Sequence, residues 1–142
     1  MLEILREGAH EVVVPEAVIQ EIHGHGSKDP TVQALDSVDW LRIVPASEIS
    51  PVVALWDLGP GESAVLSLAL ANADSWAVID DWQARRCARS LAIPFIGTLG
   101  LVLLAKEIGH IPAARPVIER LRASGMYLSD PVVDQALARV GE

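Results

Sequence analysis

Aromatic, sulfur-containing and basic side chains are all scarce in this sequence of 142 residues. Phe, Trp and Tyr make up 4% of the chain, Cys occurs once, and 11 Lys and Arg stand against 19 Asp and Glu, for a formal net charge of -8. The single thiol, Cys87, forms no internal disulfide, and no other thiol or histidine lies near it in the sequence to complete a metal site. The field of so acidic a protein repels phosphate, which excludes a protein that clamps nucleic acid through a broadly basic surface.

Long hydrophobic runs are absent as well. No apolar run approaches the roughly 18 residues of a membrane span, and the opening MLEILREGAHE lacks the basic start and apolar core of a signal peptide. We therefore expect a cytoplasmic protein that does not associate with membranes. Hydrophobic residues still make up 51% of the chain, which excludes intrinsic disorder and predicts a single domain over residues 1–142.

Short β-branched segments alternate with segments of helical periodicity. Between the β-branched segments, apolar residues recur at helical spacing, as at Ala64, Leu68 and Ala71. Strands that alternate with helices form parallel sheets covered by the helices, so the sequence predicts the α/β class. The four predicted strands are 11–15, 40–45, 75–80 and 93–97.

Prolines, glycines and small polar residues predict where the helices begin and end. Pro15 and Pro60 stand at helix starts, and Thr98 is expected to cap a helix that ends just before Gly109. Two further helices are expected to open at Pro112 and Pro131, the second capped by Ser129. The last third of the chain is therefore predicted to be a helical hairpin.

Acidic residues follow the predicted strands. Glu21 falls on the second turn of the helix after the first strand, Glu62 follows a Gly-Pro-Gly turn, and Asp80 and Asp81 directly follow the third strand. Ligands of open parallel sheets bind at the carboxyl ends of the strands, and clustered carboxylates typically hold a hard divalent cation. The chemistry that such a cluster supports is phosphodiester hydrolysis assisted by Mg²⁺ or Mn²⁺. Taken singly, each acid also has an ordinary structural interpretation, as a helix-start residue, a solvent-facing residue or a cap.

The order of the motifs resembles a known family. The string VVVPEAVIQEI is followed by WLRIVP, LGPGESAV, a strand that ends in DD, GTLG and AK. This pattern, over residues 2–140, closely resembles the PIN-domain-like proteins related to the toxins of bacterial toxin–antitoxin pairs.

The resemblance implies a fold, an activity and a set of site residues. It implies a PIN-like parallel sheet, normally of five strands with four visible here, with helices on both faces and a helical C-terminal tail. It also implies a Mg²⁺- or Mn²⁺-dependent ribonuclease that cleaves single-stranded RNA and binds an antitoxin-type protein. The catalytic and metal-binding positions it implies are Glu21, Glu62 and Asp81, with Asp80 beside it. Thr98 matches a polar position that orients water or phosphate.

One departure from the family bears on activity. Family members begin with a strand that carries a first catalytic Asp, whereas this sequence starts within the helix that follows. We therefore expect a domain that is N-terminally incomplete relative to the family and an impaired site. The alternative is a non-catalytic PIN-like module retained for dimerisation or for binding an antitoxin-type partner. A homodimer is expected in either case, because C2 dimers commonly bury surplus apolar surface.

Other residues carry weaker signals. Arg85 is a candidate phosphate-binding residue, as are Arg86 and Arg89 on the same predicted helix. For Arg89 the alternative is pairing with Asp81 or contact with solvent. A histidine pair in HGHG is interpreted as loop, since a zinc site needs more ligands. The order of Asp, Thr and Lys residues disfavours a phospho-receiver domain, a further alternative.

Overall fold

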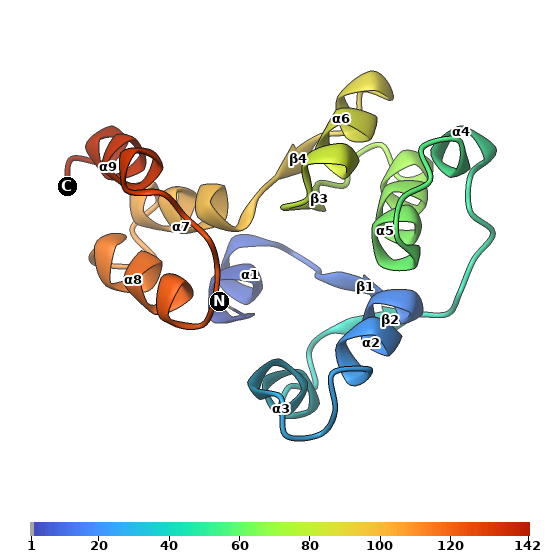
Figure 1. The fold of residues 1–142 in the computed structure, drawn as a ribbon, viewed down its shortest axis with the longest axis horizontal. Coiled ribbons are helices and arrows are strands. Elements are labelled where there is room, and N and C mark those ends of the chain that lie inside the picture. Colours follow the sequence, from blue (N-terminus) through green and yellow to red (C-terminus); the bar gives the residue numbers. More distant parts are fainter. Residues whose placement is uncertain (1) are drawn as a thin grey trace. The chain divides into compact units, whose positions relative to one another are not determined.

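The structure is a computed structural model that describes residues 2–142 (Figure 1). The chain divides into two compact units. The sheet unit is Glu11–Ile96, and the helical unit comprises residues 2–10 together with Gly97–Glu142. All four strands of the structure lie in the sheet unit.

The strands of the sheet unit form two parallel pairs. Strand β1 (Val13–Pro15) pairs with β2 (Arg42–Val44), and β3 (Ala77–Val78) pairs with β4 (Phe95–Ile96). The predicted α/β class and the parallel pairing are confirmed, although each strand is shorter than its β-branched segment. Within the described residues no ladder joins β1–β2 to β3–β4, so the four strands form two small sheets.

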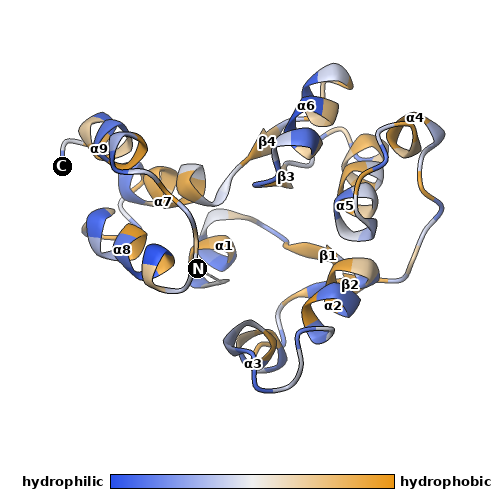
Figure 2. Ribbon diagram, viewed as in Figure 1, coloured by the Kyte–Doolittle hydropathy of each residue, from blue (hydrophilic) through white to orange (hydrophobic). Residues whose placement is uncertain are grey.

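Helix α5 (Pro60–Ala71) is the central element of the sheet unit. It contacts β1 and β3, and it also packs on α2 (Glu16–His23) and α6 (Trp82–Ser90). Its sequence, PGESAVLSLALA, is apolar or small around most of the helix, as the hydropathy colouring shows (Figure 2). A helix that is apolar on nearly every side is a buried one, which explains why α5 contacts elements of both strand pairs.

Two shorter helices complete the sheet unit. Helix α3 (Pro30–Asp36) is capped by Asp29, whose side chain accepts a hydrogen bond of 2.7 Å from the Thr31 N–H. This hydrogen bond holds the pKa of Asp29 below its usual value. Helix α4 (Pro51–Ala54) precedes the Gly-Pro-Gly turn and carries Val53, which is fully buried.

The core of the sheet unit lies where α4, α5 and α6 meet the β3–β4 pair. Leu66 and Val53 are fully buried there, together with Ala84, Cys87 and Ala88 on one face of α6. Burial raises the pKa of the Cys87 thiol, because the charged thiolate is disfavoured away from water. Cys87 is thus a core residue of the sheet unit.

The helical unit is built from four helices around a second core. The helices are α1 (Leu2–Gly8), α7 (Thr98–Glu107), α8 (Arg115–Ala123) and α9 (Asp130–Arg139). Val102, Ile118 and Leu137 are fully buried where α8 and α9 pack on α7. None of the helices within residues 2–142 is long and apolar enough to span a membrane.

Two predicted helix starts are wrong. Thr98 is the first residue of α7, and Gly97, with an extended backbone, occupies the N-cap position. Helix α8 begins at Arg115 and not at Pro112, because the chain turns through Gly109 at φ +80 and the Pro112 carbonyl accepts a hydrogen bond from Lys106. Pro131 does lie in the first turn of α9, as predicted.

Candidate functional site

The carboxylates of Glu21 and Glu62 meet at the Gly-Pro-Gly turn. Glu21 extends from the second turn of α2, and its Oε1 accepts a hydrogen bond of 2.9 Å from the backbone N–H of Gly61. A Cβ placed on Gly59 would lie 2.5 Å from Glu62 Oε2 and 3.9 Å from Glu21 Oε1. Both carboxylates therefore lie within 4 Å of one point beside Gly59.

The absence of a Cβ at Gly59 and at Gly61 makes this approach possible. A Cβ on Gly61 would collide with Glu21 Oε2 and would stand 3.0 Å from Glu21 Cδ. Pro60 between the two glycines occupies the first position of α5, where its missing N–H costs no helical hydrogen bond. The Gly-Pro-Gly sequence thus starts α5 and leaves room for two carboxylates at its N-terminus, where the helix dipole stabilises negative charge.

Asp81 has the capping role that is its ordinary structural interpretation. It is the N-cap residue of α6, and its Oδ1 accepts a hydrogen bond of 2.8 Å from the Ala84 N–H. The side chain is exposed. A cap uses one carboxylate oxygen, so this contact is compatible with a second interaction through Oδ2.

Asp80, which precedes α6, forms an ion pair with Arg85 of that helix. Arg85 Nη2 lies 3.0 Å from Asp80 Oδ1, and Arg85 Nε donates to the Ile79 carbonyl at 2.9 Å. These two contacts hold the guanidinium against the end of β3. The sequence offers Arg85 as a phosphate-binding residue, and the structure shows its guanidinium paired with Asp80.

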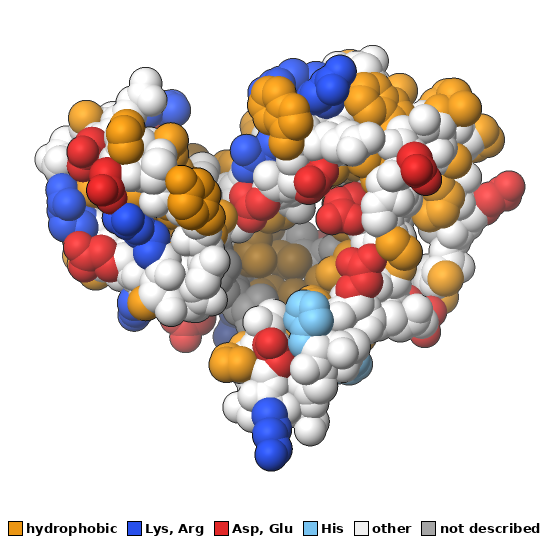
Figure 3. Space-filling model, viewed as in Figure 1, with side chains coloured by type: hydrophobic (Ala, Val, Ile, Leu, Met, Phe, Trp, Pro, Cys, Tyr) orange, Lys and Arg blue, Asp and Glu red, His pale blue; other side chains and the backbone are white. Residues whose placement is uncertain are grey.

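Within the described residues, the four predicted site acids form two separate pairs and do not form a single metal-binding cluster. Among residues 2–142 no group of three or more His, Cys, Asp or Glu side chains is placed to hold a metal ion. Glu21 and Glu62 form one pair, and Asp80 and Asp81 form the other at the start of α6. All four acids belong to the sheet unit, and Asp and Glu side chains are visible on the face between α2, α5 and α6 (Figure 3). Thr98 belongs to the helical unit.

Helix α6 places its arginines against aromatic rings, an arrangement that sequence reasoning missed. The Arg86 guanidinium carbon lies 5.9 Å from the centroid of the Trp56 ring, and that of Arg89 lies 5.5 Å from the Phe95 ring. Trp56 lies 30 positions before Arg86 in the sequence. The sequence does signal that Trp82, Arg86 and Arg89 share one face of the helix, because they stand at i, i+4 and i+7. It does not signal which rings the arginines meet.

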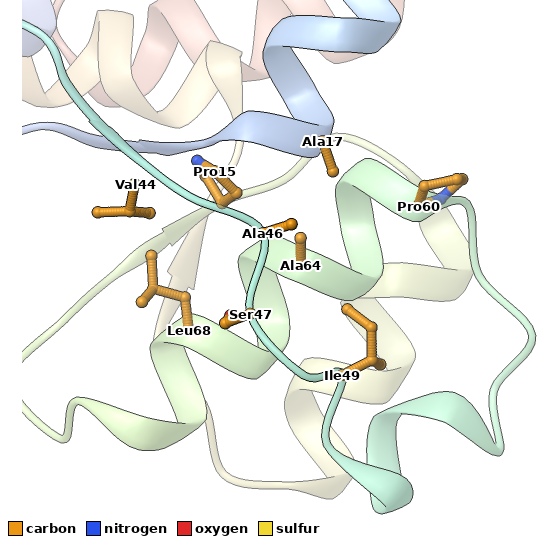
Figure 4. A pocket seen from close by; sticks show the side chains of 9 residues that line it. All are labelled: Pro15, Ala17, Val44, Ala46, Ser47, Ile49, Pro60, Ala64 and Leu68. Carbon is orange, nitrogen blue, oxygen red and sulfur yellow. The ribbon is translucent and has the colours of Figure 1, made fainter.

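An apolar cavity of about 220 Å³ lies between α5 and the β1–β2 pair. Val44 of β2, Ile49 of the following loop and Leu68 of α5 line it, together with Pro15 and Pro60 (Figure 4). No charged side chain lines this cavity. The chemistry of the chain is therefore expected at the acidic residues and not in the cavity.

The sheet unit is a parallel α/β unit in which acidic residues follow the strands. The sequence profile of a family described as PIN domain matches residues 1–142, the whole chain. The chain therefore belongs to the PIN-domain family. Comparisons with curated proteins and with solved structures gave no match.

Proposed function

We propose that this PIN-domain protein is a Mg²⁺- or Mn²⁺-dependent endoribonuclease that cleaves single-stranded RNA in the cytoplasm as the toxin of a toxin–antitoxin pair. The observation that carries the proposal is the meeting of the Glu21 and Glu62 carboxylates at the Gly59–Gly61 turn. Carboxylates that repel each other are held together here by a hydrogen bond and by two residues without side chains. Such an arrangement is typical of a cation site.

The donor set fits a hard divalent cation. Mg²⁺ prefers oxygen ligands and is commonly held by one or two carboxylates, with water and substrate phosphate completing its shell. Glu21 and Glu62 would hold the ion in this chain. When bound, Mg²⁺ or Mn²⁺ would neutralise phosphate charge and lower the pKa of a water molecule.

The chain's own residues would position the ligands and the substrate. The Gly61 N–H fixes Oε1 of Glu21, the same oxygen that would lie 3.9 Å from a Cβ on Gly59, beside Glu62. Asp81 presents a carboxylate at the start of α6, and Asp80 keeps the Arg85 guanidinium close to it. We propose that Asp81 and Asp80 complete the acidic site and that Arg85 and Thr98 contact the RNA phosphate.

The test is RNA cleavage with matched metal and variant controls. The 142-residue protein is incubated with a labelled single-stranded RNA in EDTA, in Mg²⁺ and in Mn²⁺, and Glu62→Gln is compared with Glu119→Gln on the surface of α8. Slow cleavage in Mn²⁺ or Mg²⁺ alone, in keeping with the impaired site expected from the sequence, is predicted, and it should be lost in Glu62→Gln and kept in Glu119→Gln. Metal-independent cleavage, or cleavage that Glu62→Gln leaves unchanged, contradicts the proposal.

The toxin role has a separate cellular test. Induced expression in bacteria is expected to arrest growth, and Glu62→Gln is expected to relieve the arrest. Co-expression of an antitoxin-type protein should restore growth and yield a stable complex on purification. If cells that express an active, soluble enzyme grow unimpaired, the toxin role is refuted while the ribonuclease activity still stands.

A second candidate function is a non-catalytic PIN-like module that binds an antitoxin-type protein or a second copy of itself. The observation that favours it is the separation of the acids into two pairs, with no metal-ready group of three within residues 2–142. For this module, light scattering is expected to give a dimer, and the cleavage assay is expected to be negative in every metal.

A further inference from the structure

Helix α6 has two chemically distinct faces. Ala84, Cys87 and Ala88 are fully buried on one side. On the opposite side, Trp82, Arg86 and Arg89 stand at positions i, i+4 and i+7, which lie above one another on a helix. Trp82 has 65% of its surface exposed, and neither arginine is buried.

The two outward arginines are positioned by rings and not by acids. Arg86 lies over Trp56 at 5.9 Å and Arg89 over Phe95 at 5.5 Å. Within residues 2–142 neither of them has a carboxylate partner, whereas Arg85 of the same helix is paired with Asp80. A guanidinium held over a ring by a cation–π contact keeps its N–H donors available.

This surface contrasts with the rest of the molecule. The chain has a net charge of -8, yet α6, WQARRCARS, carries three arginines and no acid. In the space-filling view, Lys and Arg side chains gather over α6 next to hydrophobic side chains (Figure 3). The helix begins directly after Asp80 and Asp81, so its basic face adjoins one of the two acidic pairs.

An exposed indole beside guanidinium groups held over rings has the composition of a single-strand binding surface. Aromatic rings stack on bases of any sequence, and arginines contact the phosphates between them. A protein partner would need acidic residues to meet the arginines and an apolar side chain to meet Trp82. The ring-supported guanidinium planes favour RNA, because bases stack on such planes while a carboxylate only meets their edges.

We propose that the outer face of α6, formed by Trp82, Arg86 and Arg89, binds single-stranded RNA and leads its backbone to the Asp80–Asp81 end of the helix. The inference rests on the proposed function in one respect, which is that the bound RNA is then cleaved. Trp82 stacks on a base, and Arg86 and Arg89 contact successive phosphates. This path places a phosphate next to the carboxylates without any basic residue from outside α6.

The test measures RNA binding in EDTA, where no cleavage takes place. Fluorescence anisotropy with labelled oligo(U) is recorded over a range of salt concentrations for the wild type, Trp82→Ala and the double variant Arg86→Gln/Arg89→Gln. Trp82→Ala is expected to weaken binding roughly 5- to 100-fold, because a base then has no ring to stack on. The double variant is expected to reduce the slope of log K against log salt by about 0.7 for each phosphate that an arginine no longer neutralises.

Matched controls carry the same changes on another part of the surface. Tyr127→Ala removes an exposed aromatic side chain, and Arg120→Gln removes an exposed arginine of α8. Both controls are expected to bind oligo(U) as the wild type does, and circular dichroism is used to check that every variant is folded. If folded Trp82→Ala and Arg86→Gln/Arg89→Gln keep wild-type affinity and salt slope, the proposal is overturned and the surface is left to a protein partner.

Failure of this inference is distinguishable from failure of the proposed function. RNA that binds in EDTA through α6 but is cleaved in no metal supports the surface and refutes the ribonuclease. Metal-dependent cleavage whose KM is the same in the wild type and in the α6 variants supports the ribonuclease and refutes the surface.

Discussion

Glu21 accepts a hydrogen bond from the backbone N–H of Gly61, a residue 40 positions further along the chain, at 2.9 Å. The contact joins the second turn of α2 to the first turn of α5. It directs a carboxylate onto a turn where Glu62 already stands, and it needs a residue without a side chain at position 61.

A substitution at Gly61 is expected to change the catalytic rate without changing the stability of the fold. Gly61→Ala is expected to push the Glu21 carboxylate off the turn, because the new Cβ collides with Oε2. A displacement of this kind costs roughly 100-fold in catalytic rate. The free energy of unfolding should change by less than about 1 kcal/mol, since Ala favours the helix by about that amount and offsets the broken hydrogen bond.

The control for this experiment is Gly8→Ala, where a Cβ meets nothing within 4 Å. RNA cleavage and thermal denaturation are measured for both variants. A Gly61→Ala protein that is as active as the wild type would show that the Glu21 contact has no part in the site.

Asp81 allows its capping role to be separated from its charge. Asn caps helices about as well as Asp, so Asp81→Asn is expected to keep the stability of α6 and to lower metal-dependent cleavage. Asp81→Ala is expected to lose about 1 kcal/mol of stability in addition. Urea denaturation and cleavage rates are measured for both variants. Equal cleavage by the wild type and Asp81→Asn would show that Asp81 serves only as the N-cap of α6.

Glu142 makes the stability of the helical unit depend on pH. Its carboxylate accepts hydrogen bonds from the N–H groups of Ala114 at 2.7 Å and Arg115 at 3.0 Å, and these hold its pKa below the ordinary 4.5. Because the pKa is lowered in the folded state, the stabilisation is present above pH 4.5 and is lost as the pH falls through the lowered value. Thermal denaturation should give a lower Tm for Glu142→Gln than for the wild type near neutral pH, and the two should converge in acid.

The control for the pH experiment is Glu119→Gln, an exposed change on α8. Its Tm is expected to follow that of the wild type at every pH. A constant difference between Glu142→Gln and the wild type over the whole acid range would show that protonation of Glu142 is not responsible.

Cys87 reports on the integrity of the sheet unit. The thiol is fully buried and its pKa is raised, so the reactive thiolate is scarce in the folded protein. Iodoacetamide is expected to label Cys87 slowly in buffer and rapidly in denaturant, as followed by mass spectrometry. Rapid labelling of the native protein would contradict the placement of α6 against α5.

The sequence predicts the elements of this fold better than their ends. The β-branched segments form four parallel strands, as predicted, although the strands are not wholly buried: Ile43 of β2 has 54% of its surface exposed and Val78 of β3 has 42%. Thr98 and Pro112 mislead the placement of two helix starts, because a backbone already extended at Gly97 and a turn at Gly109 determine where the helices begin. Caps depend on local backbone geometry that residue type alone does not specify.

The candidate site is predictable from the sequence only as a set of acids. Spacing places Glu62 in the first turn of α5 and Glu21 in the second turn of α2, and both positions are as predicted. The contact between Glu21 and Gly61 depends on how α2 packs on α5, which no local pattern encodes. The stacking of Arg86 on Trp56 has the same origin, since the two residues meet only once the chain around α4 has packed near α6.

The central claim is that Glu21 and Glu62 act together as ligands of one divalent cation, and a Mn²⁺ titration by calorimetry tests it most directly. The wild type, Glu21→Gln, Glu62→Gln, the double variant and the control Glu119→Gln are compared at one pH and salt concentration. The account predicts that each single variant loses most of the Mn²⁺ affinity, that the double variant is little worse than either, and that Glu119→Gln binds as the wild type does. Equal Mn²⁺ affinity in the wild type and Glu62→Gln, or no Mn²⁺ binding by the wild type, would contradict it.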